Sequence, residues 1–118
     1  QGVTDEVFAT VLDRVSRVPG VRGVLVVDAQ AGVPVVAEVE DGVADSAVAA
    51  LATALFRRAA RAAEGSEFGH LDALQLEAEG GHVVVAGAGE LLLVAVAAGD
   101  AQLGLLRLEV QRAVEDLW

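Results

Sequence analysis

The chain has 118 residues, of which 54% are hydrophobic and only 3% aromatic, and its 18 acidic and 8 basic residues give a formal charge of −10. This length fits a single domain over residues 1–118. The negative charge argues against nucleic acid as a partner, because binding to phosphates requires a cationic surface. The chain has no cysteine, which excludes both a disulfide framework and a thiolate metal site.

The N-terminal segment has the pattern of an amphipathic helix. Thr4 is a suitable N-cap residue, and Asp5 and Glu6 place negative charge at the positive end of the helix dipole. Pro19 and Gly20 end the helix. Between these limits the apolar residues recur at helical spacing and predict one buried face: Val7, Val11, Leu12, Val15 and Val18.

A β-hairpin is predicted next. Residues 22–28 and 33–39 are rich in β-branched side chains, and residues 29–32 have the composition of a turn. Pro34 lies early in the second strand and has no N–H to donate to a neighbouring strand. We therefore expect residues 33–39 to form an edge of the sheet.

The second helix is predicted from Ala47 to about Glu64, with Asp45 or Ser46 as its cap and Gly65 as its end. It carries two apolar stripes, one of larger and one of smaller residues. The first consists of Val48, Leu51, Leu55 and Ala59, and the second of Ala47, Ala50 and Ala54. Two stripes require two partners, and one of them can be a second copy of the chain.

Arg57, Arg58 and Arg61 form the densest positive charge of this acidic protein. Their position near the C-terminal end of the second helix is typical of a solvated end that complements the helix dipole. Docking onto an acidic partner and an arginine finger for a nucleotide hydrolase are the functional alternatives.

The C-terminal half contains three predicted strands and a last helix. Within residues 71–79, alternation predicts a strand with one wet face: Leu74, Leu76 and Ala78 alternate with Gln75, Glu77 and Glu79. Residues 82–98 are almost wholly apolar, so both faces of this hairpin should be buried. The turn and the charge at residues 87–90 argue against membrane insertion. Asp100 is the expected cap of a helix that ends near Leu117.

The predicted order is therefore α-β-β-α-β-β-β-α. Five strands joined mainly by hairpins indicate an α+β fold with one antiparallel sheet sandwiched by helices. We expect the first and third helices on one face of the sheet and the second helix on the other. Without a leader or targeting tail in the sequence, a cytoplasmic location is the default expectation.

The sequence contains few candidate residues for a catalytic, metal-binding or cofactor-binding site. No serine lies in a nucleophile elbow, so we expect no enzyme and no catalytic residue. His70, His82 and Asp72 lack the spacing of a metal site, and we interpret the histidines as exposed strand ends, with no metal bound. Residues 87–89 suggest a phosphate-binding loop, but a strand follows instead of a helix, so we expect a turn and no cofactor. Trp118 is expected to pack on the first helix, and an exposed contact anchor is the alternative.

Two stretches resemble a known family. PGVRGVLVVDAQAG followed by VPVVAEV resembles the opening of the Roadblock/dynein light chain (Roadblock/LC7) family, in which a helix leads through a Gly-Val pair into a strand that ends in Asp. GGHVVVAGAGELLLVAVAAGDAQLGLLRLEVQRA resembles its second half, a core hairpin followed by a helix. The resemblance covers essentially the whole chain and is greatest to bacterial MglB-type members.

The resemblance implies a non-enzymatic homodimer with a Roadblock/profilin-like fold. The second helix of each chain would pack on its mate, and the strand containing Gln75 and Glu77 would pair across the twofold. Bacterial members commonly act beside Ras-like small GTPases in polarity, gliding motility or signalling, and the MglB-type dimer stimulates its GTPase without donating an arginine. A passive dimeric scaffold and a small-ligand sensor are the alternatives.

Overall fold

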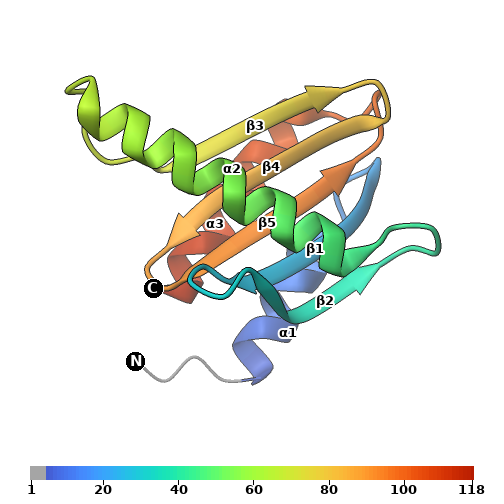
Figure 1. The fold of residues 1–118 in the computed structure, drawn as a ribbon. Coiled ribbons are helices and arrows are strands. Elements are labelled where there is room, and N and C mark those ends of the chain that lie inside the picture. The colour runs from blue at the N-terminus through green and yellow to red at the C-terminus, as the bar shows by residue number, and fades with distance from the viewer. Residues whose placement is uncertain (1–4) are drawn as a thin grey trace.

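A computed structural model describes residues 5–118, so the predicted cap at Thr4 lies outside the described residues. Three helices and five strands follow one another in the predicted order, which confirms the α+β class (Figure 1). Their bounds are α1 (Asp5–Ser16), β1 (Val21–Asp28), β2 (Val33–Val39), α2 (Asp45–Gly65), β3 (Ala73–Ala78), β4 (Gly81–Ala88), β5 (Leu91–Ala97) and α3 (Leu103–Leu117).

The strands form one antiparallel sheet in the order β2-β1-β5-β4-β3. Pro34 lies on β2, at one edge of the sheet, as its missing N–H predicts. β3 forms the other edge and pairs with β4 alone in the described part of the chain. The apolar strand β5 lies at the centre.

The helices cover the sheet from both sides. α2 crosses one face diagonally, while α1 and α3 lie side by side on the opposite face (Figure 1). Each face has its own buried cluster. Leu25, Val27, Leu92 and Val94 pack beneath α2, whereas the cluster under α1 and α3 contains Val11, Val15, Val24, Val26, Leu93, Leu106 and Val110. The prediction that the central strands are buried on both faces is confirmed.

The predicted stripe of larger residues on α2 is only partly right. Ala49, Ala52 and Thr53 are the buried residues of this helix, whereas Leu51 is 47% exposed. Small side chains let the helix lie close to the sheet, whose leucines and valines fill the interface. The Thr53 hydroxyl is satisfied within the helix, since it donates to the Ala49 carbonyl at 2.8 Å.

The predicted helix caps are wrong in detail. The N-cap positions of α2 and α3 are Ala44 and Gln102, and neither makes a side-chain capping hydrogen bond. Asp45 lies inside the first turn of α2, where its carboxylate accepts from the Ser46 N–H at 2.7 Å. There its charge still complements the helix dipole. Asp100 lies in the turn that precedes α3.

Candidate functional site

The side of α2 that faces away from the sheet is lined by small and apolar residues. Ala47, Ala50 and Ala54 are exposed there together with Leu51, and their three- and four-residue spacing places them on one stripe. Arg58 and Arg61 are exposed and continue the stripe toward the C-terminal end of the helix. We call this set the α2 outer face: Ala47, Ala50, Leu51, Ala54, Arg58 and Arg61.

Arg57 differs from its two arginine neighbours. Its guanidinium donates to the Ala29 carbonyl oxygen at 2.9 Å and also to the Gln30 carbonyl oxygen. Both carbonyls belong to the turn between β1 and β2, so Arg57 ties α2 to this turn. The three arginines predicted as one cluster therefore divide into one structural clamp and two exposed cations.

Asp28 stabilises the same turn from within. Its Oδ1 accepts hydrogen bonds from the Gln30 N–H at 2.9 Å and from the Ala31 N–H at 3.0 Å. These backbone donors lower the pKa of Asp28 below its ordinary value, and the positive charge of Arg57 adds to the effect. The turn is thus held by a carboxylate inside it and a guanidinium outside it.

The second candidate surface is the free edge of β3. Gln75 is paired with Val84 and Glu77 with His82, and Val84 belongs to the cluster beneath α1 and α3. Because side chains alternate along a strand, Gln75 and Glu77 point toward the α3 face, whereas Leu74 packs on the α2 side. The structure therefore separates the predicted interface residues between the two faces of the sheet, and the free β3 edge lies between them.

The family model described as "Roadblock/LC7 domain" matches residues 7–97. The chain belongs to the Roadblock/LC7 family. An uncharacterised protein of Methanocaldococcus jannaschii is 31% identical over 107 residues, which cover 91% of this chain and 93% of that protein. A second protein of this archaeon, also uncharacterised, is 30% identical over the same fractions of both chains.

Solved Roadblock/LC7 structures share the fold. MglB of Myxococcus xanthus superposes with a TM-score of 0.84 at 19% identity, covering 98% of this chain and 94% of that chain. The gliding protein MglB of Thermus thermophilus gives 0.83 at 24% identity, with 99% and 90% covered. A Roadblock/LC7 domain from Streptomyces avermitilis gives 0.79 at 20% identity, with 97% and 93% covered. One further MglB structure has a tetrameric arrangement.

The two histidines of this Roadblock/LC7 domain lie at opposite ends of the β3–β4 hairpin. His70 precedes β3 and is exposed, with its Nε2 3.8 Å from Asp72 Oδ1. The prediction of exposure is wrong for His82, which is 6% exposed and whose Nε2 lies 3.2 Å from the Gly99 carbonyl oxygen. Within residues 5–118 no group of three or more His, Asp or Glu side chains is arranged to hold a metal ion.

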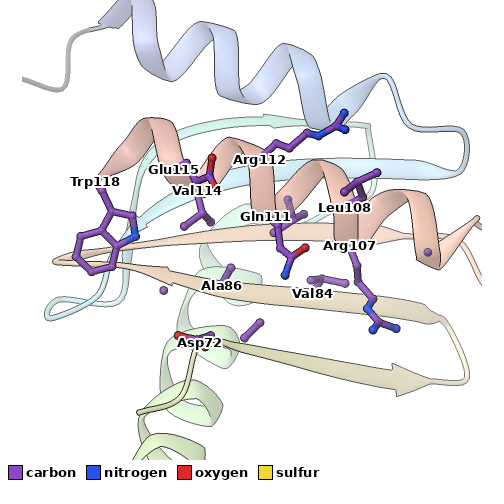
Figure 2. A pocket seen from close by; sticks show the side chains of 14 residues that line it. Asp72, Val84, Ala86, Arg107, Leu108, Gln111, Arg112, Val114, Glu115 and Trp118 are labelled. Atoms are coloured by element: carbon purple, nitrogen blue, oxygen red, sulfur yellow. The ribbon is translucent and has the colours of Figure 1, made fainter.

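A groove of about 990 Å³ runs between α3 and the β3–β4 side of the sheet (Figure 2). Val84 and Ala86 form part of its floor, and Gln111 and Arg107 project over it from α3. Trp118 lies at one end. Its ring packs over the β4–β5 turn, since a Cβ added at Gly89 would meet it at 3.3 Å.

The predicted packing of Trp118 on the first helix is therefore wrong, and the side chain is 66% exposed. No local pattern indicates that the chain end reaches the β4–β5 turn. The turn itself is confirmed, because β4 ends at Ala88 and β5 begins at Leu91.

Among residues 5–118 no helix has the length and apolar content needed to cross a membrane.

Proposed function

We propose that this Roadblock/LC7 domain is a homodimer in which two copies of the α2 outer face pack together and the two β3 edges pair. Ala47, Ala50 and Ala54 support the proposal most directly, because three exposed alanines on one stripe let two helices approach closely. Leu51, 47% exposed beside them, would gain burial in the same contact.

The free edge of β3 supports the same arrangement. An edge strand presents unpaired N–H and C=O groups, and pairing with a second copy satisfies them. The edge formed by β2 is a poorer candidate because Pro34 lacks a donor and the pairing with β1 is irregular between Val26 and Val27. One twofold axis can bring the two β3 edges and the two α2 outer faces together.

The dimer would act as a non-enzymatic regulator of a Ras-like small GTPase. Family membership and the MglB-like fold support this function. An arginine supplied by Arg57 is not part of the proposal, since its guanidinium already holds the β1–β2 turn. Arg58 and Arg61 remain exposed and can contact an acidic surface of the partner.

The test is to mix the purified chain with the Ras-like GTPase encoded nearest to it and to measure GTP hydrolysis and complex formation. We expect a complex with the GTP-bound form and faster hydrolysis. A complex without any change in hydrolysis would favour the passive scaffold, and neither complex nor rate change would contradict the proposed function.

A further inference from the structure

The face of the sheet opposite α2 is not fully covered. α1 packs over β1 and α3 over β4, whereas β3 extends beyond α3 on this side of the sheet (Figure 2). Ala73, Gln75 and Glu77 of β3 are accordingly exposed. The groove beside α3 therefore has a wall on one side only, and its other side is open across β3.

The proposed dimer would close this opening into a trough. Pairing of the two β3 edges places a second α3 on the far side, with β4 and β3 of both copies as the floor. Three spacings of about 4.8 Å separate the two β4 strands by about 14 Å, and because each α3 also contacts β5, the two α3 axes lie between about 14 and 19 Å apart. Packed helices have axes about 8–10 Å apart, so one helix fits between the two α3 helices when their axes are separated by at least about 16 Å, which the upper part of this range allows.

The walls are partly apolar. Leu108 of α3 is 42% exposed, Trp118 directly after the helix is 66% exposed, and Val114 is half-buried between the helix and the floor. Large exposed apolar side chains that gather along one groove are typical of a surface that a partner covers. The occupant therefore needs an apolar side.

Asp72, Glu115, Arg107 and Arg112 line the groove, and Glu77 and Glu109 beside it give its surroundings an excess of negative charge. Asp72 and Glu115 line its Trp118 end, and Glu77 extends from β3 onto the same face. Arg107 is the cation that projects over the floor, while Arg112 lies 3.5 Å from the Glu109 carboxylate. With a formal charge of −10 on the whole chain, the field around the trough favours a cationic occupant.

We propose that this trough binds one basic amphipathic helix of a partner protein per dimer. This inference rests on the proposed homodimer, because one copy supplies only one wall. The apolar side of the bound helix would lie against Trp118, Val114 and Leu108, and its Lys or Arg side chains would meet Asp72, Glu77 and Glu115.

Trp118 is the single tryptophan of the chain, so its fluorescence reports directly on the groove. The probe is a synthetic peptide of about four helical turns, with leucine and lysine at helical periodicity. We expect a saturable blue shift of the Trp118 emission, with one peptide bound per two chains by titration calorimetry. A peptide in which glutamate replaces every lysine should leave the emission unchanged.

Two double variants with the same change in net charge distinguish binding in the groove from general attraction of a cationic peptide to an acidic protein. Asp72→Lys with Glu115→Lys alters the groove, whereas Glu38→Lys with Asp41→Lys makes the same charge change beside the opposite sheet edge. We expect the first pair to weaken peptide binding at least tenfold and the second less than threefold. An equal loss in both pairs, or an unchanged Trp118 emission, would overturn the inference.

The same samples distinguish this inference from the proposed function. A dimer by light scattering that stimulates the GTPase but does not shift its Trp118 emission would refute the trough alone. A chain that stays monomeric would refute the dimer, and it would also refute the predicted ratio of one peptide to two chains.

Discussion

Arg57 connects α2 to the β1–β2 turn through two backbone carbonyl groups. We predict that Arg57→Ala lowers the free energy of unfolding by about 1 kcal/mol, which is below the usual range for charged hydrogen bonds because the side chain is exposed to solvent. Arg58→Ala, one residue further on, should change it by less than about 0.5 kcal/mol. Urea denaturation compares the two, and equal effects would contradict the clamp.

The backbone at Gly81 begins β4 in a conformation that L side chains rarely adopt. Its φ is 137°, and an added Cβ would clash with the Ala97 carbonyl oxygen. We expect Gly81→Ala to destabilise the fold by at least about 2 kcal/mol. Gly80→Ala is the matched control, because nothing lies within 4 Å of its added Cβ. A similar midpoint for both variants in denaturant would refute this expectation.

The lowered pKa of Asp28 predicts a dependence of stability on pH. Its ordinary value is 3.8, and the N–H groups of Ala31 and Gln30 favour the ionised form in the folded chain. The stabilisation is therefore complete above the unfolded pKa and is lost as the pH decreases through the folded value. Asp28→Ala should melt below the wild type at pH 7.

At pH 2 the difference in melting temperature between Asp28→Ala and the wild type should be smaller. Asp28→Asn keeps an oxygen acceptor without the charge, so its melting temperature should lie between the other two at pH 7. A difference between Asp28→Ala and the wild type that is the same at both pH values would show that the ionised carboxylate contributes nothing to the turn.

At the scale of elements, α2 is the helix on which the proposed dimer depends. Ala50→Arg or Ala54→Arg would place a long charged side chain in a close helix contact, where it has no buried partner. We predict a shift from dimer to monomer by at least tenfold in dissociation constant. Ala9→Arg makes the same change at an exposed position of α1, on the other face, and should leave the mass unchanged.

Circular dichroism must show folded protein for both α2 variants, since an unfolded chain would also lose its partner. If Ala50→Arg and Ala54→Arg both stay folded and dimeric, the interface does not lie on the α2 outer face. The β3 edge would then be the remaining candidate of the two surfaces.

The elements with a strong periodic pattern could be predicted from the sequence. Uninterrupted apolar runs indicated that β4 and β5 are buried on both faces, and Pro34 indicated the edge position of β2. The face that α2 turns to the sheet was harder, because size suggested Leu51 whereas close approach selected Ala49 and Ala52. Local spacing contains no information on how near a helix lies to its sheet.

Contacts between residues that are far apart in the chain could not be predicted from the sequence either. The hydrogen bonds from Arg57 to Ala29 and Gln30 join residues 28 and 27 positions apart. His82 is buried because its strand pairs with both β3 and β5, which its polar character alone does not predict. The position of Trp118 depends on where α3 ends above the β4–β5 turn.

For the whole molecule, the free β3 strand forms one edge of the sheet, and the open groove beside α3 lies next to it on one face. On the other face α2 crosses the sheet diagonally from β2 toward β3. A second copy at the β3 edge would pair the strand, complete the trough and bring the two α2 helices together. Partner recognition would then be a property of the dimer.

The mass of the purified chain in solution tests the proposed homodimer most directly. One chain is 12.0 kDa, so a homodimer has about twice that mass, near 24 kDa. We predict this value by size-exclusion chromatography with light scattering at micromolar concentration. A mass that stays at 12.0 kDa over the accessible concentration range would contradict it.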